Sequence, residues 1–239
     1  MTDADAREVD EDVLPAHLLA GYATFLSGRF RGEQARFREL AETGQAPKTM
    51  IIGCCDSRVA PEAIFDAGPG ELFVLRNVAN LVPPYEPDDH YHGASAALEY
   101  AVTALKVRHI VVLGHARCGG VAAYATSLAN KDAAPLSAGN FIGRWIRLLA
   151  PAAERAGEPP AVVDSAYMER LEFESIKQCL RNLRSFPMIQ VLEQRHYLRL
   201  HGAYFGVMDG RLLAYDEARD QFVPVAADQH AAAYSQARF

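Results

Sequence analysis

The sequence predicts an α/β fold: an open, mainly parallel central sheet of four to five strands flanked by helices, with an antiparallel edge strand and an N-terminal helical arm. Three observations carry this prediction. Short, wholly apolar runs are typical of strands that are buried on both faces. A helical repeat of apolar residues lies between two of these runs, and a strand–helix–strand order favours parallel pairing through a crossover. Further along, an Asp-Gly pair between two strand-like runs indicates a hairpin.

The N-terminal part of the chain is expected to be helical. Apolar residues recur at helical spacing over Val13–Leu26, which predicts an amphipathic helix. A second helix is expected over Gly32–Thr43, because Gly44 is a typical helix-ending residue. The acidic residues 1–12 before these helices carry no periodic pattern and are expected to form a tail or arm.

The sheet signals begin after these helices. The three apolar runs expected to form strands are Thr49–Gly53, Glu71–Arg76 and Arg108–Gly114. Between the last two, Gly93–Val107 carries alanines and leucines on one helical stripe. The helices expected downstream are Cys118–Ala129, Phe141–Ala150 and Asp164–Arg184. The hairpin signal is Asp209-Gly210, within the strand-like stretch Tyr197–Tyr215.

The composition excludes several classes of protein. The chain has 239 residues, of which 50% are hydrophobic and 23% charged, as is usual for a globular protein. Its net charge of -6 and scattered basic residues argue against a nucleic-acid partner. No apolar run approaches the roughly 20 residues that cross a bilayer, and the N-terminus lacks a secretory pattern. We therefore expect a cytoplasmic protein with no membrane partner.

The four cysteines are too few for a disulfide framework, and two of them are adjacent. In a reducing compartment, clustered cysteine and histidine residues more often indicate metal binding or catalysis. The cysteines therefore direct attention to two short motifs.

The first motif is GCCDSR, at the carboxyl end of the first predicted strand. Open α/β sheets bind their ligands at this edge. If the extended conformation persists, Cys54, Asp56 and Arg58 share one face, which selects Cys54 rather than Cys55 as the functional thiol. The alternative is a buried apolar cysteine pair beside a surface Asp–Arg pair.

The second motif is GHARCGG, at the end of the third predicted strand. His115 and Cys118 are three residues apart, close enough to meet one ion where the chain turns into a helix. Alone, the pair is a weak signal, because a core histidine beside a buried cysteine is an equal alternative. Together the two motifs would converge on one crevice. Two thiolates and one imidazole suit tetrahedral zinc and leave a fourth position open, as in catalytic sites.

With the intervening FVLRNVANLVPPY, these motifs resemble the β-class carbonic anhydrases. The resemblance is close over Gln45–Tyr124 and looser through HGAYFGVMDG. It implies reversible hydration of carbon dioxide to bicarbonate and a proton, by attack of zinc-bound hydroxide. The residues implied to bind one zinc ion per subunit are Cys54, His115 and Cys118, and those implied to act in catalysis are Asp56 and Arg58.

The resemblance also implies a pocket for carbon dioxide and bicarbonate. Its implied residues are Gln45, Phe73, Val78, Tyr100 and Gly119. Gln45 matches a glutamine of the plant-like subgroup, while Ile51 stands where a bacterial subgroup with an inhibitory bicarbonate site has tryptophan. The open, plant-like form is therefore favoured. Because the family is built from dimers that share the apolar wall, a homodimer or homotetramer is expected.

On this basis residues 1–12 are an acidic tail, 13–44 a helical arm and 45–239 a single zinc-binding α/β catalytic domain. Two other functions stay open. Relatives of the fold hydrolyse carbonyl sulfide or carbon disulfide with the same ligands. A non-catalytic zinc module, such as a bicarbonate sensor, is less favoured, because a closed structural site would usually have a fourth Cys or His nearby.

Overall fold

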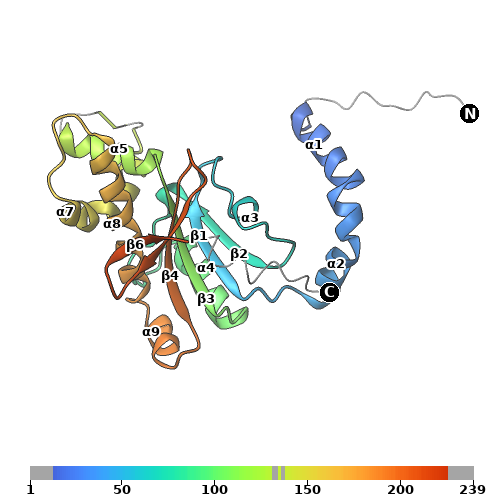
Figure 1. The fold of residues 1–239 in the computed structure, drawn as a ribbon. Coiled ribbons are helices and arrows are strands. Elements are labelled where there is room, and N and C mark those ends of the chain that lie inside the picture. Colours follow the sequence, from blue (N-terminus) through green and yellow to red (C-terminus); the bar gives the residue numbers. More distant parts are fainter. Residues whose placement is uncertain (1–12, 131–133, 136–137, 226–239) are drawn as a thin grey trace, which may run out of the picture. The chain divides into compact units, whose positions relative to one another are not determined.

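A computed structural model describes residues 13–130, 134–135 and 138–225 (Figure 1). The chain falls into two compact units, residues 1–45 and 46–239. The acidic tail expected over residues 1–12 lies outside the described residues. Within the described part, no helix combines the length and the apolar character that a bilayer span requires.

The first unit is a pair of helices, α1 (Ala16–Ser27) and α2 (Arg29–Thr43), joined at Gly28. Both predicted helices are confirmed, although the second begins three residues earlier than expected. Their junction is packed by aromatic rings with centroids 5.3 to 6.0 Å apart, those of Phe25, Phe30 and Phe37. No residue of either helix is buried in the described chain.

The second unit is built on a six-stranded sheet in the order β2-β1-β3-β4-β5-β6. In chain order the strands are β1 (Thr49–Cys54), β2 (Leu72–Asn77), β3 (His109–His115), β4 (Arg199–Phe205), β5 (Leu212–Asp216) and β6 (Gln221–Pro224). The first four in sheet order are parallel and the last two antiparallel. The mainly parallel sheet with an antiparallel edge is therefore confirmed. It is larger than the four to five strands predicted, because β6 is short, at most half-buried and has no distinct apolar run.

The strands predicted from apolar runs all end one residue later than expected. As a result Cys54 is the last residue of β1 and His115 the last residue of β3. The register pairs Gly53 with Leu113, so these two strand ends lie next to each other. Both candidate motifs therefore start at the same edge of the sheet.

Seven α-helices belong to the described part of the second unit. They are α3 (Pro61–Ile64), α4 (Gly93–Glu99), α5 (Gly119–Ala129), α6 (Phe141–Trp145), α7 (Ala150–Ala156), α8 (Ser165–Leu183) and α9 (Pro187–Gln194). The helix expected over Asp164–Arg184 is confirmed as α8, with Asp164 as its N-cap. The helix predicted over Gly93–Val107 stops earlier, because α4 passes into a π-helical turn. The helix predicted over Phe141–Ala150 is divided by a 3-10 turn.

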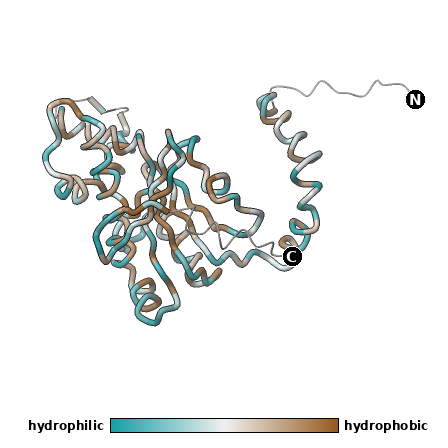
Figure 2. Tube along the Cα trace, viewed as in Figure 1, coloured by the Kyte–Doolittle hydropathy of each residue, from teal (hydrophilic) through white to brown (hydrophobic). Residues whose placement is uncertain are grey.

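The helices are distributed unequally over the two faces of the sheet. α8 packs against β3 and β4. Side chains of α4, α5, α7 and α9 are buried in the same hydrophobic cluster, and Figure 1 shows these helices around the sheet. In the part of the chain that the structure describes, α3 alone contributes a helical residue, Ile64, to the smaller cluster of Ile51, Leu113 and Ala203 on the other face. Hydrophobic residues follow the central strands (Figure 2), as the apolar runs predicted. The strands are therefore held rigidly, and their ends are suitable supports for a site.

Close packing against α8 leaves one glycine of β3 little room for a side chain. A Cβ added to Gly114 would lie 2.6 Å from Cδ1 of Ile176, closer than packed carbons approach. We expect Gly114→Ala to lower the free energy of unfolding by about 1–3 kcal/mol, measured by urea denaturation. Gly32→Ala in α2 is the matched control, because an added Cβ there meets nothing within 4 Å. Equal urea midpoints for wild type and Gly114→Ala would contradict this packing.

Candidate metal centre

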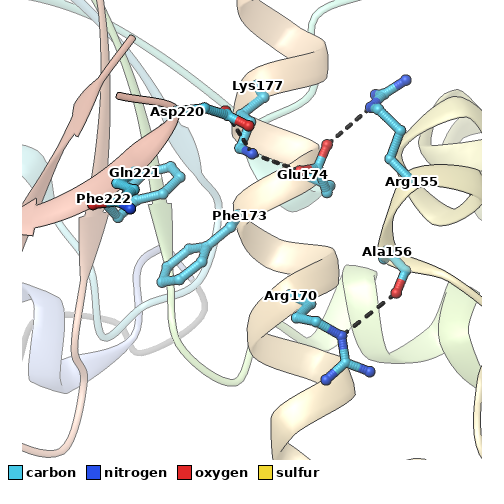
Figure 3. Close-up of a pocket in the computed structure, with 9 residues that line it drawn as sticks. All are labelled: Arg155, Ala156, Arg170, Phe173, Glu174, Lys177, Asp220, Gln221 and Phe222. Carbon is cyan, nitrogen blue, oxygen red and sulfur yellow. Dashed lines mark hydrogen bonds and ion pairs between the residues drawn. The ribbon is translucent and has the colours of Figure 1, made fainter. Parts of the chain in front are cut away.

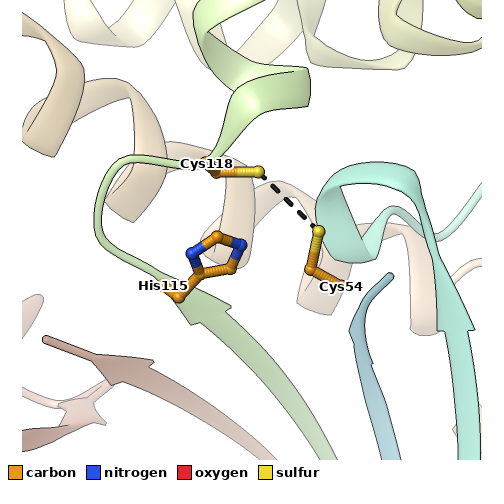
Figure 4. A group of neighbouring side chains, drawn as sticks. All are labelled: Cys54, His115 and Cys118. Carbon is orange, nitrogen blue, oxygen red and sulfur yellow. Dashed lines mark hydrogen bonds between the residues drawn. The ribbon is translucent and has the colours of Figure 1, made fainter. Parts of the chain in front are cut away.

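Three buried side chains converge at the carboxyl edge of the sheet (Figure 4). Cys54 ends β1, His115 ends β3, and Cys118 caps the start of α5. Their ligand atoms all lie within 4.8 Å of one another, and the two sulfurs are 3.9 Å apart. The structure therefore brings together the three ligands expected from the sequence.

The cluster fits a tetrahedral metal ion. Zinc–sulfur bonds of about 2.3 Å at the tetrahedral angle place two sulfurs roughly 3.8 Å apart, close to the observed 3.9 Å. The Nδ1–H of His115 donates to the carbonyl of Ala116 at 2.9 Å, which leaves Nε2 as the ligand atom. That Nε2 is buried and has no hydrogen-bond partner among the described residues. Because an unpaired buried nitrogen is costly, a bound ion would stabilise it.

One hydrogen-bonding proton joins the two sulfurs and shifts their pKa values in opposite directions. The hydrogen bond from Cys118 lowers the pKa of Cys54 to about 4, although burial opposes the shift. The same hydrogen bond, together with burial, raises the pKa of Cys118. A divalent cation would take the place of this proton, because metal binding releases protons from thiols.

The strand that carries the first motif ends at Cys54, and a turn follows after two further residues. The chain turns at Ser57–Arg58, where the N–H of Val59 donates to the carbonyl of Asp56 at 3.1 Å. Cys54 is buried in the cluster and Cys55 is exposed, which supports the choice of Cys54. The alternation expected as far as Arg58 is wrong, because the turn interrupts it. Arg58 reaches Asp56 through the turn rather than from the same strand face.

Asp56 is held by a bidentate contact with Arg58. Nε donates to Oδ1 at 2.9 Å and Nη2 donates to Oδ2 at 2.6 Å. These hydrogen bonds hold the pKa of Asp56 well below its usual range. Asp56 Oδ2 lies 4.0 Å from Nε2 of His115, so the ionised carboxylate borders the metal cluster. Arg58 also donates to the carbonyl of Arg117 at 3.2 Å, which connects the two ligand segments.

Two of the expected pocket residues form an aromatic pair away from this cluster. The ring centroids of Phe73 and Tyr100 are 5.9 Å apart. Phe73 is paired with Met50, four residues before Cys54, which is roughly 13 Å along the strand. The structure therefore does not bring this pair to the cluster of the same chain. Tyr100 is 49% exposed, so the pair is open at the surface.

The other expected pocket residues lie closer in the chain to the ligands. Gly119 follows Cys118 as the first residue of α5, where backbone N–H groups have no acceptor within the helix. A Cβ on Gly120 would lie 2.8 Å from Cγ1 of Val78, so Val78 packs against the first turn of α5. Gln45 belongs to the first unit, and its place in the pocket stays a prediction.

The sequence analysis missed Glu172, a buried residue on α8 that supports the cluster. Its Oε1 accepts the backbone N–H of Cys118 at 3.0 Å, and its Oε2 accepts the hydroxyl of Tyr204 at 2.7 Å. Burial raises the pKa of Glu172, against the effect of these hydrogen bonds. The sequence does carry a signal for this residue. Glu172 precedes the core residues Ile176 and Cys179 by four and seven positions, so all three lie on the same buried stripe of the helix. An acid on a buried stripe needs a polar partner.

A short segment with unusual backbone angles also escaped sequence analysis. Ala79 and Asn80, which follow Val78, have positive φ angles of 64° and 49°. The carbonyl of Val78 accepts Nε1–H of Trp145 at 2.8 Å. The side chain of Asn77 bonds both the N–H and the carbonyl of Leu81 at 2.8 Å. These hydrogen bonds hold the segment that packs beside the start of α5.

A separate cavity of about 360 Å³ lies between α7, α8 and β6 (Figure 3). Most of its charged groups form ion pairs with one another, and Arg170 donates to the carbonyl of Ala156. Glu174 bonds Arg155 at 2.9 Å and Lys177 at 2.7 Å, and Lys177 also bonds Asp220 at 2.8 Å. Among the described residues, the only group of three or more potential metal ligands is the one at the sheet edge. The metal centre is therefore assigned there.

Comparison with known proteins agrees with this geometry. The family model described as carbonic anhydrase matches residues 49–212, which include both ligand motifs. The chain belongs to the carbonic anhydrase family. A curated carbonic anhydrase from Pseudomonas aeruginosa is 36% identical over 209 residues, which cover 87% of this chain and 91% of the relative.

Solved structures place the enzyme in the β class. The β-carbonic anhydrase CcaA is 31% identical, with a TM-score of 0.73 over 89% of this chain and 92% of that chain. A tetrameric β-carbonic anhydrase from Sordaria macrospora is 29% identical, with a TM-score of 0.69 over 83% of this chain and 94% of that chain. The enzyme catalyses the reversible hydration of carbon dioxide to bicarbonate. The carbonyl sulfide, carbon disulfide and sensor alternatives are not favoured.

The support that Glu172 gives to Cys118 can be tested directly. We expect Glu172→Leu to lower the affinity for zinc by about 10- to 100-fold, because the backbone of a ligand loses its buried acceptor. Competition with a chromogenic chelator measures this affinity. Glu169→Leu, one turn away on the same helix and exposed, is the matched control. Equal zinc affinities for the two variants would show that Glu172 does not support the site.

Proposed function

We propose that the enzyme uses one zinc ion per chain, held by Cys54, His115 and Cys118. The observation that carries this proposal is the unpaired, buried Nε2 of His115 beside two sulfurs at tetrahedral spacing. Two thiolates and one imidazole form a donor set that zinc prefers, with a fourth position left open. Zinc in this position would lower the pKa of a bound water, but less than in a three-histidine site, because two thiolates cancel the charge of the ion.

Asp56 and Arg58 then serve as the catalytic pair of the hydration reaction. The carboxylate of Asp56 stays ionised because Arg58 binds both of its oxygens, so it acts as an acceptor and not as a donor. The carboxylate lies at the border of the cluster, where it accepts a hydrogen bond from the attacking hydroxide. This hydrogen bond orients the hydroxide, so that a lone pair on its oxygen faces the carbon of carbon dioxide. The products are bicarbonate and a proton.

The substrate pocket is proposed to be completed by a second copy of the chain. Phe73 and Tyr100 lie away from their own cluster, so in a homodimer they would line the partner's site. Apolar residues of the first unit, including Leu18 and Tyr22, are exposed, as expected of an arm that packs on another subunit. The Sordaria relatives are described as tetrameric, so two such dimers form the tetramer proposed as the alternative assembly.

The remaining pocket residues define the proposed subgroup. Val78 contributes an apolar wall, Gly119 a backbone N–H, and Gln45 a side-chain amide. Gln45, together with Ile51 in place of tryptophan, supports the open, plant-like form.

All four cysteines of the chain are free, which supports a reducing, cytoplasmic location.

Adjacent cysteines provide a sharp test of the zinc ligands. We expect Cys54→Ser to reduce bound zinc far below one ion per chain and to abolish hydration, because a ligand thiolate is lost. Cys55→Ser should keep zinc and activity, since its side chain is exposed. Atomic absorption and stopped-flow hydration measure the two properties. Equal zinc contents in both variants would refute the assignment.

The orienting role of Asp56 predicts a variant that binds zinc but reacts slowly. We expect Asp56→Ala to retain the metal and to lose about 100-fold or more in kcat, the scale of a misplaced reacting group. Glu62→Ala on α3 is the control, because Glu62 is exposed and carries an equal charge. Near-normal turnover in Asp56→Ala would remove the proposed role.

A further inference from the structure

Arg76 lies at the sheet edge and bonds the main chain of the first ligand motif. It is the second-last residue of β2 and pairs with Gly53 in the register. Its Nε donates to the carbonyl of Cys54 at 2.7 Å, and its Nη2 donates to the carbonyl of Asp56 at 2.6 Å. One half-buried guanidinium therefore bonds the carbonyls on both sides of Cys55. Such charge-assisted hydrogen bonds are stronger than neutral ones.

These bonds occur where the sheet stops holding the chain. The N–H of Cys55 donates to Asn77 at 2.9 Å, and the chain then turns away from β2. Arg58 bonds the carboxylate of Asp56, but both residues belong to the same turn and would move together. The bond that Arg58 makes outside the turn, to the carbonyl of Arg117, is longer at 3.2 Å. Arg76 instead joins the turn to a neighbouring strand.

A small movement of this turn would change the site. Asp56 Oδ2 is 4.0 Å from Nε2 of His115. Two ligands of one tetrahedral zinc ion, each about 2.0 Å from it, lie roughly 3.3 Å apart. With respect to His115, the carboxylate oxygen is therefore about 0.7 Å beyond the spacing of a zinc ligand, so this is the group that would fill the fourth position if the turn moved toward the cluster.

We propose that Arg76 is a positioning residue for carbon dioxide hydration. It fixes the main chain from Cys54 to Asp56, so that the carboxylate stays on Arg58 and the fourth ligand position stays open. The inference rests on the proposed role of Asp56 and adds the residue that enforces it. Lysine cannot replace Arg76 fully, because an ammonium group lacks the planar fork that spans two carbonyls.

The test compares Arg76→Gln, Arg76→Lys and the control Arg108→Gln in the zinc enzyme and in its cobalt-substituted form. Arg108 is exposed, and no side-chain partner is described for it in residues 13–225. We expect Arg76→Gln to keep one metal ion per chain, while kcat falls about tenfold or more. Azide, which needs the open position, should bind the cobalt form about tenfold more weakly. Arg76→Lys should lie between Arg76→Gln and wild type, and the control should match wild type.

A double variant separates positioning from general support of the fold. In Arg76→Gln/Asp56→Ala, azide binding should return to the wild-type level, because no carboxylate remains to fill the position. Three results would overturn the proposal: loss of metal in Arg76→Gln, wild-type turnover and azide binding in that variant, or no recovery in the double variant. If Asp56→Ala alone hydrates carbon dioxide normally, the catalytic role of Asp56 fails, while the azide titrations still report on Arg76.

Discussion

Parallel pairing between β1 and β3 is the constraint on which the site depends. Because Gly53 is opposite Leu113, the two strands end side by side, with Cys54 and His115 as their last residues. A slip of one residue would turn one of these side chains to the opposite face of the sheet. Cys118 then needs only the three-residue connection to α5 to complete the cluster. The metal centre is therefore a product of strand register.

The surroundings of the cluster keep this arrangement in place. On the helix-covered face, α8 packs so closely on β3 that Gly114 has no room for a side chain, and the same helix carries Glu172 to the backbone of Cys118. On the other side, Arg58 and Arg76 bond the segment that follows β1. Buried anionic donors are stable only when paired. Hydrogen bonds and guanidinium groups provide partners for the carboxylates, and the proposed zinc ion would provide one for the thiolates.

Sequence patterns were most informative where the local signal was strong. Apolar runs predicted β1, β2 and β3 to within one residue, and the Asp-Gly pair marked the hairpin between β4 and β5. The short helices α3, α7 and α9, and strand β6, were missed because a few residues show too little periodicity. The alternation argument separated the buried Cys54 from the exposed Cys55, but it failed at the turn that follows. A turn at Ser57–Arg58 cannot be recognised from alternation alone.

By itself, the sequence determined the fold class, the two ligand motifs and the family that they resemble, because these depend on local periodicity and residue identity. Only the tertiary structure decided which groups support the ligands. Glu172 is 54 residues from Cys118, and Arg76 is 20 residues from Asp56, and each meets its partner through packing between elements distant in the chain. The tertiary structure also places Phe73 and Tyr100 away from the metal-ligand cluster of the same chain. Such distances depend on register and helix packing, which no local pattern encodes.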